Sequence, residues 1–292
     1  FLLDLPDNKK DHLLPQARKL QKTTSQLTGS YRPEIDGIRA FAVIAVIINH
    51  VNKELLPSGY LGVDIFFVIS GYVITSSLSW RDSRDLWDFI LSFYARRIKR
   101  LVPALFLYIL IIGFAVCLFN PNPSQSLRTG MMALIGMSNL YLLNQSTDYF
   151  AQATELNPFT NTWSLAVEEQ FYLLFPLLVW LSGFGRKTIS GSKNLFMISL
   201  ALSISSLACF IFLNNTNQPA AYFLMITRFW EMAGGCLLYL AFLKRSLFVD
   251  SLEKVSPFLV LSAMVSVMLL SPSNAIFATI AICALTAILI AS

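Results

Sequence analysis

The stretch LVPALFLYILIIGFAVCLF, residues 101–119, decides the fold class because its nineteen residues include no charged side chain. A helix needs about 20 apolar residues to cross the hydrocarbon core of a bilayer. The rest of the chain repeats this pattern in seven further apolar runs, at residues 38–56, 60–79, 165–183, 195–213, 221–243, 256–271 and 275–291. We therefore predict an all-α fold, a polytopic transmembrane helix bundle with about eight spans.

The composition supports a membrane protein and argues against a soluble one. Of the 292 residues, 55% are hydrophobic and only 13% are charged, whereas soluble domains are about 25% charged. The net charge of +5 is compatible with nucleic-acid binding, but the basic residues gather in the loops between apolar runs. We predict a lipid bilayer and no nucleic acid as partner, and the sequence leaves the oligomeric state open.

The distribution of basic residues predicts the orientation in the membrane. The loops after the second, fourth and sixth runs are basic, with Arg81, Arg84, Arg96, Arg97, Lys99, Arg100, Arg186, Lys187, Lys193, Lys244, Arg245 and Lys254. Cytoplasmic loops carry the excess of Lys and Arg, which places the N-terminus inside. Residues 1–33 then form a polar cytoplasmic segment, and residues 34–292 form a transmembrane domain. The chain begins at Phe1 and ends inside an apolar run, so we expect a C-terminally truncated fragment.

The segment TGMMALIGMSNLYLL, residues 129–143, is apolar but too short to cross the bilayer. If it crossed, every later basic loop would move to the outside. We therefore predict an external interfacial or re-entrant helix. The sequence shows no internal repeat and no paired broken helices, the two signs that indicate many transporters.

The four cysteines, Cys117, Cys209, Cys236 and Cys283, each lie inside an apolar run, without CxxC spacing. Free cysteines in such surroundings are usually small buried hydrophobic residues. We predict no disulfide framework, no zinc and no other metal site.

Arg39 and His50 are ionisable residues in the first apolar run, and such residues are costly in a membrane and therefore candidates for function. Eleven helical steps of about 100° make three turns plus about 20°, so the two side chains share one face, about 16 Å apart. A neutral imidazole is the usual general base near pH 7, which makes His50 a catalytic candidate. The alternative is an interfacial histidine at a helix end.

Two acidic residues near the external ends of later runs are further candidates. Asp64 could orient or charge His50 across a short external loop. Glu168 lies in TWSLAVEEQFY, residues 162–172, at the entrance of the fourth run. The alternative for both is a favourable interaction with the helix dipole, and Trp163 would then be an interfacial anchor.

Two arginine groups complete the candidates. FYARRIKRLVP, residues 93–103, places Arg96, Arg97 and Arg100 at the entrance of the third run. Guanidinium groups bind phosphates with two parallel donors, although positive-inside charge explains the same residues. In the sixth run, Arg228 and Glu231 have the spacing of a self-neutralising ion pair, which is the alternative to a functional role.

Several of these segments together resemble the acyltransferase-3 family of bacterial membrane acyltransferases. They are YRPEIDGIRAFAVIAVIINH (31–50), GYLGVDIFFVISGYVITSSL (59–78), FYARRIKRLVPA (93–104), NTWSLAVEEQFYLLFPLL (161–178) and RFWEMAGGCLLYL (228–240). They occur in the family's order, and the ten residues between Arg39 and His50 match the family's signature. The chain departs from the pattern in having about eight spans where the family has about ten.

The resemblance implies a bundle of about ten helices in the bacterial inner membrane that moves an acyl group, often acetyl, from cytoplasmic acyl-CoA to a hydroxyl of a glycan or glycolipid. It implies that His50 and Arg39 are the essential pair, that Glu168 belongs to a further family signature, and that Arg96, Arg97 and Arg100 belong to the cytoplasmic arginine motif. Family acceptors include O-antigen lipopolysaccharide, exopolysaccharide, peptidoglycan, root-signalling oligosaccharides and macrolides, so the acceptor stays open.

We accordingly expect His50 to act as general base or to carry the acyl group itself. Asp64 or Glu168 would hold its tautomer, and Arg39 with the inner arginines would bind acyl-CoA, a co-substrate rather than a resident cofactor. The alternative is a transporter or flippase of a lipid-linked glycan, whose intramembrane charges would line a path.

Overall fold

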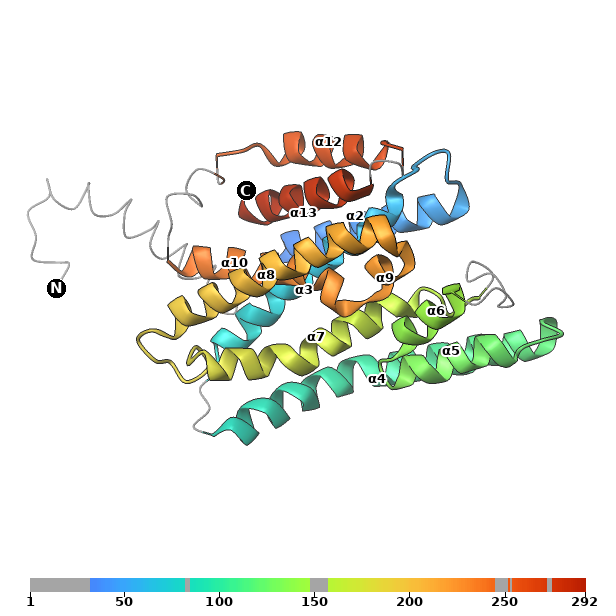
Figure 1. The fold of residues 1–292 in the computed structure, drawn as a ribbon, viewed down its shortest axis with the longest axis horizontal. Helices are drawn as coiled ribbons and strands as arrows, with labels where there is room; N and C mark the ends of the chain where they lie inside the picture. The colour runs from blue at the N-terminus through green and yellow to red at the C-terminus, as the bar shows by residue number, and fades with distance from the viewer. Residues whose placement is uncertain (1–31, 82–84, 148–156, 245–251, 253, 272–274) are drawn as a thin grey trace, which may run out of the picture.

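The structure is a computed structural model that describes residues 32–81, 85–147, 157–244, 252, 254–271 and 275–292. Most of the predicted cytoplasmic segment 1–33 therefore lies outside the described residues. Within them the chain is helical throughout, and the long helices run roughly side by side along the long axis of the molecule (Figure 1). The elements are α2 (Pro33–Val51), η1 (Gly59–Leu61), α3 (Gly62–Ser79), α4 (Leu86–Phe119), α5 (Ser124–Leu134), α6 (Ser138–Thr147), α7 (Thr162–Leu181), α8 (Gly191–Thr216), α9 (Gln218–Phe223), α10 (Met225–Leu243), α12 (Pro257–Met268) and α13 (Ala275–Ala291).

Five of the helical segments in the described residues are long and apolar enough to cross a membrane, and they contain α3, α4, α7, α8 and α10. α12 and α13 are shorter apolar helices. Each of the eight predicted apolar runs coincides with one or two helices. The prediction of an all-α, multi-pass membrane protein is confirmed.

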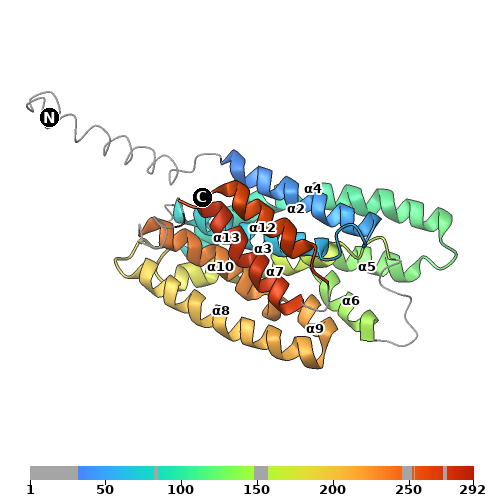
Figure 2. The same ribbon diagram turned by 90° about the horizontal axis from the view of Figure 1, so that it is seen from above.

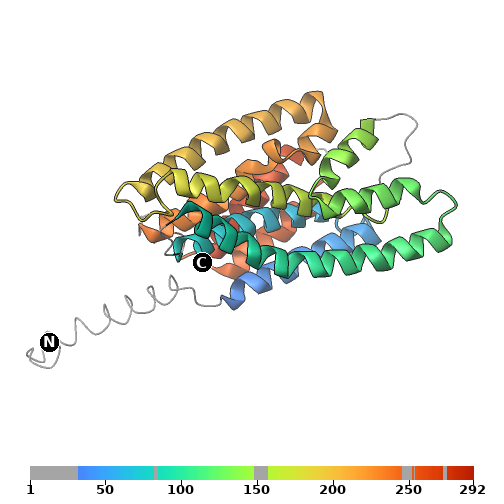
Figure 3. The ribbon, with the colours of Figure 1, turned by 90° about the horizontal axis from the view of Figure 1, so that it is seen from below.

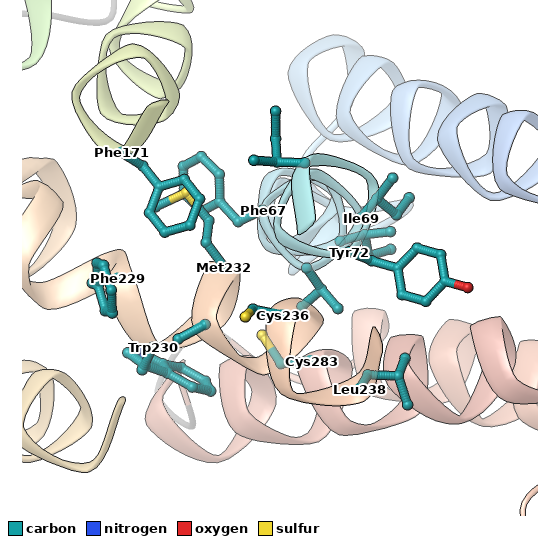
Figure 4. Packing of buried hydrophobic residues seen from close by; sticks show 14 of the residues in the cluster. Phe67, Ile69, Tyr72, Phe171, Phe229, Trp230, Met232, Cys236, Leu238 and Cys283 are labelled. Carbon is teal, nitrogen blue, oxygen red and sulfur yellow. The ribbon is translucent and has the colours of Figure 1, made fainter. Parts of the chain in front are cut away.

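Helices α3 and α10 form the centre of the bundle. In each of them, 72% of the membrane window is buried, against 17% in α4 and 22% in α8. Side chains of α7, α10 and α13 pack around α3 (Figure 4). The backbones of α3 and α10 touch, because a Cβ at Gly71 would collide with the Met232 carbonyl and one at Gly235 with the Val68 carbonyl. Small residues allow this close approach of membrane helices.

Helix α2 carries the two signature residues and packs mainly on α3 and η1. Figure 2 shows it between α4 on one side and α12 and α13 on the other. Its buried face is made of Ile35, Ile38, Ala42, Ala45 and Asn49. The Arg39–His50 face lies beside this buried face, and both residues keep access to the surroundings of the bundle.

Helix α4 is longer than the predicted span. Its 34 residues extend over about 51 Å, and it lies at the edge of the bundle (Figure 3). The helix begins early because Asp85 caps it, accepting a hydrogen bond of 3.3 Å from the Trp87 N–H. Phe89 and Phe93 then bury one face of its first half. The inner arginines consequently lie inside the helix, just before its charge-free half, rather than in a loop.

The apolar segment 129–143 is a helical hairpin rather than one helix. Helices α5 and α6 meet at a sharp turn in which Gly136 has a φ of 69°, a left-handed conformation that favours glycine. α5 turns back along α4, and α6 leaves toward the same end of the molecule (Figure 1). The expectation of a single helix is wrong because this turn divides it, and the external or re-entrant placement of the segment stays a prediction.

The sixth apolar run is also broken, at Leu224, whose ψ of 136° separates α9 from α10. Side chains satisfy the carbonyls that the break frees. Arg228 Nε donates to the Tyr222 carbonyl at 3.2 Å, and Asn139 Nδ2 of the hairpin donates to the Phe223 carbonyl at 2.9 Å. This is one break in one of the predicted runs, and the sequence pattern did not predict it. Such breaks are tolerated at membrane depth when protein groups satisfy the backbone.

The hairpin leads to a prediction about topology. Ser124 and Ser146 are exposed at its two ends, so we expect both to face the outside. In a protein without other cysteines, Ser124→Cys and Ser146→Cys should each react with an impermeant maleimide added externally. Labelling of one from each side would mean that the segment crosses. Cys117 must be replaced first, because it is exposed on α4.

The exposure of Cys117 is contrary to the prediction that all four cysteines are buried. Cys236 and Cys283 are buried as predicted.

Candidate active site

His50 is exposed at the end of α2 and makes one informative contact. Its Nδ1 lies 2.8 Å from the Val46 carbonyl oxygen in the preceding turn. A carbonyl oxygen only accepts, so Nδ1 carries the hydrogen in this contact and Nε2 of the neutral ring keeps its lone pair. The helix itself thus sets the tautomer that a general base requires, and presents Nε2 to the surroundings.

Arg39 lies about 16 Å from His50 along the same face of α2. It forms an ion pair of 3.1 Å with Asp36, which precedes it by three residues, and both side chains are partly exposed. The charge of Arg39 also acts on Glu168 and on Arg97, which belong to α7 and α4. Arg39 therefore influences charged groups of α4 and α7 through space, while its direct contact is with Asp36 of its own helix.

A polar cluster joins α3, α4 and α7 beside Arg39. The Tyr172 hydroxyl donates to Glu168 Oε2 at 2.6 Å and lies 3.2 Å from the Ser70 hydroxyl. The Arg97 guanidinium stacks over the Tyr172 ring, 4.7 Å from its centroid, and its charge acts on Glu168. The Glu168 carboxylate thus lies within electrostatic range of two arginines from different helices, without an ion pair to either among the described residues.

The arginine motif divides between two environments. Arg97 is half-buried and faces the cluster, whereas Arg96 and Arg100 are exposed. Helix geometry separates Arg97 from Arg96 by about 100°, but it leaves Arg97 and Arg100 within about 60° of each other. The difference between these two arises because Tyr172 of α7 packs against Arg97, whereas Arg100 is exposed. Of the three predicted binding arginines, Arg97 alone joins the cluster in the described residues.

Asp64 has a different partner from the one predicted. Its buried carboxylate accepts a hydrogen bond of 2.8 Å from Arg228 Nη1, which also donates to Glu231 at 2.9 Å. The aromatic rings of Trp163, Phe210 and Tyr222 lie 5.9, 5.3 and 5.2 Å from this guanidinium. The expectation that Asp64 or Glu168 holds the tautomer of His50 is corrected, because the Val46 carbonyl makes that contact. The expected Arg228–Glu231 ion pair is present and includes Asp64 as a third member.

A cavity of about 430 Å³ lies next to the polar cluster. Its walls come from α4, from the turn between α5 and α6, and from α7, and they consist of Tyr94, Arg97, Ile98, Leu101, Val102, Leu134, Ile135, Gly136, Met137, Glu169, Gln170, Tyr172 and Leu173. His50 and Arg39 are not among them. The cavity begins where the arginine motif gives way to the charge-free half of α4, and within the described ranges no group of His, Cys, Asp or Glu is suited to hold a metal ion.

Comparison with known families agrees with this arrangement. The family model described as an acyltransferase domain, the third of its acyltransferase series, matches residues 32–292. The chain belongs to the acyltransferase-3 family. It is 40% identical over 209 residues to O-acetyltransferase OatA of Staphylococcus aureus, and the aligned region covers 71% of this chain and 34% of that protein. It is 36% identical over 224 residues to peptidoglycan O-acetyltransferase OatA of Listeria monocytogenes, covering 74% of this chain and 35% of that protein.

The chain therefore spans about a third of the length of these relatives. No solved structure matches it at a significant level. Of the residues that the acyltransferase-3 resemblance marked, the structure places Arg97 and Glu168 on opposite sides of the Tyr172 side chain, and Arg39 acts on both only through its charge. It leaves His50 at the C-terminal end of α2, encloses Asp64 in the bundle centre, and exposes Arg96 and Arg100.

Three further residues of the polar cluster and the cavity, Tyr172, Ser70 and Glu169, were not singled out from the sequence. A signal existed for Tyr172, which follows Glu168 by four residues and so faces it on one helix. Ser70 gave no such signal, because its approach depends on how α3 packs against α7. Glu169 was visible in the sequence, but only the cavity shows that it faces a different space from Glu168.

Proposed function

We propose that this chain is the membrane part of an O-acyltransferase that takes an acyl group, most simply acetyl, from acyl-CoA at the cytoplasmic side. The acceptor would be a hydroxyl of a cell-surface glycan, with peptidoglycan favoured because a listerial relative is named for it. The observation that carries this proposal is the α2 face. It has a cation, Arg39, toward one end, and at the other end His50, with Nε2 directed away from its own helix.

The residues divide the work in the following way. Arg39 and Arg97 would bind the phosphates of the donor, because guanidinium groups form charge-assisted hydrogen bonds with phosphate. His50 Nε2 would accept the proton of the acceptor hydroxyl while the oxygen of that hydroxyl bonds to the acyl carbon. The carbon–sulfur bond then breaks, and the thiolate leaves. In the alternative order, His50 first takes the acyl group and passes it on.

The rival function is transport without covalent chemistry. It gains one observation, since the hairpin and the α9–α10 break resemble the discontinuous helices of transporters. The freed carbonyls of Tyr222 and Phe223 are, however, occupied by Arg228 and Asn139, so they are not available to coordinate cargo. The relatives are named as transferases, which favours the enzyme.

The test uses protein reconstituted in proteoliposomes with acetyl-CoA, radiolabelled in the acetyl group, on the Arg96 side and peptidoglycan fragments on the other. We expect release of free CoA together with label on the glycan. Movement of a lipid-linked glycan without consumption of acetyl-CoA would establish the transporter instead. Correctly inserted protein that neither releases CoA nor labels the acceptor would contradict the proposal.

The division of the arginine motif predicts unequal effects of Arg→Lys substitution. Lysine keeps the positive charge that orients the chain but lacks the planar fork that binds phosphate with two donors. Arg97→Lys should raise KM for acetyl-CoA by about 5–30-fold, equivalent to about 1–2 kcal/mol. The double variant Arg96→Lys/Arg100→Lys is the matched comparison and should change KM by less than about threefold. Equal increases in KM in both proteins would show that Arg97 contributes no more to acetyl-CoA binding than Arg96 and Arg100.

A further inference from the structure

The cavity between α4, the hairpin turn and α7 has an unusual balance of polar groups. Most polar side chains in its wall are already bonded to other protein groups. The Tyr94 hydroxyl donates to the Leu173 carbonyl at 2.9 Å. Gln170 Nε2 lies 2.9 Å from the Gly136 carbonyl and 2.8 Å from Asn139 Oδ1. Bonded groups of this kind shape a cavity but offer little to a ligand.

Arg97 and Glu169 are the exceptions among the described lining residues. Arg97 contacts the rings of Tyr172 and Phe93 through its guanidinium face, and no hydrogen bond to its N–H groups is found within the described part of the chain. The Glu169 carboxylate likewise has no hydrogen-bond or ion-pair partner there. Half-buried charged groups normally have partners, since desolvation is costly. The polar atoms of Arg97 and Glu169 remain accessible rather than enclosed, so their donors and acceptors are available to a ligand in the cavity.

The hairpin turn holds Glu169 in this position. Gly136 lies directly against the end of this side chain, because a Cβ at that position would be 2.8 Å from Glu169 Oε2. Gln170, the next residue of α7, binds the Gly136 carbonyl and fixes the turn against the helix. Glu168, the residue before Glu169, instead accepts a hydrogen bond from the Tyr172 hydroxyl. The two adjacent glutamates thus serve different spaces.

The wall predicts the chemistry of its ligand. Arg97 requires an anionic group, and Glu169 requires an N–H or O–H donor. Between them, the remaining wall is apolar, with Ile98, Leu101, Val102, Leu134, Ile135, Met137 and Leu173. A slender molecule with a phosphate at one end, amide N–H groups along its length and aliphatic segments between them satisfies all three requirements. The acylated phosphopantetheine arm of an acyl-CoA has this constitution.

We propose that this cavity binds the acylated phosphopantetheine arm of acyl-CoA. Arg97 binds the phosphate next to the pantetheine, and Glu169 accepts a hydrogen bond from an amide N–H of the arm. The inference rests on the proposed acyl-CoA donor and adds to it a specific pocket and a substrate-contacting carboxylate.

The test compares binding of three competitors against radiolabelled acetyl-CoA in nanodiscs: acetyl-CoA, acetyl-4′-phosphopantetheine and acetylpantetheine. All three contain the arm amides, but acetylpantetheine lacks phosphate. Glu169→Met should weaken all three by a similar factor, about 5–20-fold. Arg97→Met should weaken the two phosphate-bearing compounds by about tenfold or more and leave acetylpantetheine within about twofold.

Glu169→Gln provides the matched variant. It retains a carbonyl acceptor of the same shape, so its loss of affinity should be clearly smaller than that of Glu169→Met. Thermal unfolding of both proteins shows whether either has lost its fold, and the glutamine variant keeps the test valid if methionine does. The readout does not depend on turnover.

Unchanged affinity of Glu169→Met and Glu169→Gln for all three compounds would overturn the assignment, even if the wild type transfers acetyl normally. So would an effect of Glu169→Met on the KM for the glycan alone, which would make the cavity an acceptor site. Failure of the wild type to consume acetyl-CoA is a separate result, and it counts against the proposed function itself. If the Arg97→Met protein still binds the two phosphate-bearing compounds more tightly than acetylpantetheine, by the same factor as the wild type, the phosphate binds elsewhere.

Discussion

Replacing His50 by alanine should reduce acyl transfer by about 10²–10⁴-fold, the usual contribution of a general base. The side chain is exposed, and its recorded hydrogen bond is the one to the Val46 carbonyl. Removing an exposed side chain of this kind normally changes stability by less than about 0.5 kcal/mol. Membrane insertion and thermal stability should therefore remain close to those of the wild type, while CoA release and glycan labelling fall together.

His50→Asn sharpens this experiment. The asparagine amide can donate to the Val46 carbonyl in place of Nδ1–H, but it has no basic nitrogen where Nε2 stood. If the imidazole acts as the base, the asparagine variant should be as inactive as alanine. If the histidine is only an interfacial residue that caps its own helix, asparagine should restore activity. Recovery to more than about a tenth of the wild-type rate would therefore exclude His50 as the base.

The second large effect concerns stability. Arg228→Met should destabilise the bundle by about 3–5 kcal/mol, because breaking a buried ion pair leaves uncompensated charge in a medium of low dielectric constant. Here two carboxylates, Asp64 and Glu231, lose their partner at once. The Tyr222 carbonyl at the helix break also loses its donor. We expect a marked fall in Tm in detergent and a loss of monodisperse protein.

Two controls separate the triad from a general effect of removing an arginine. Arg39→Met breaks the partly exposed pair with Asp36, and exposed pairs contribute about 0–1 kcal/mol, so Tm should change little even though transfer is lost. A triple variant, Arg228→Met/Asp64→Leu/Glu231→Leu, removes all the charges together and should recover much of the lost stability. If Arg228→Met alone leaves Tm unchanged, the triad does not hold the bundle centre together.

This prediction gives Asp64 a role that the sequence could not supply. An aspartate near the start of α3 suggested a partner for His50 across a short external loop. The structure instead directs its carboxylate inward, to Arg228 of α10. The separation of 164 residues along the chain explains the failure, because spacing rules describe neighbours on one helix and say nothing about which helices pack together.

The sequence by itself determined the fold class and the signature face of α2. Uncharged runs such as residues 101–119 have few alternatives to a transmembrane helix, since a bilayer provides no partner for unpaired backbone groups. The period of 3.6 residues likewise placed Arg39 and His50 on one face before any packing was known. Both conclusions depend on local geometry and on the solvent, which the order of residues already specifies.

Only the tertiary structure decided what these residues contact. The breaks at Gly136 and Leu224 became visible where one segment satisfies the backbone of another, as Asn139 does for the Phe223 carbonyl. The approach of Arg97 to Tyr172 and Glu168 requires α4 to pack against α7, and the separate space that Glu169 faces exists only because the hairpin turns against α7. Such contacts arise from the packing of side chains that are far apart in the chain. The hydrophobic pattern of each helix does not specify which other helices it will contact.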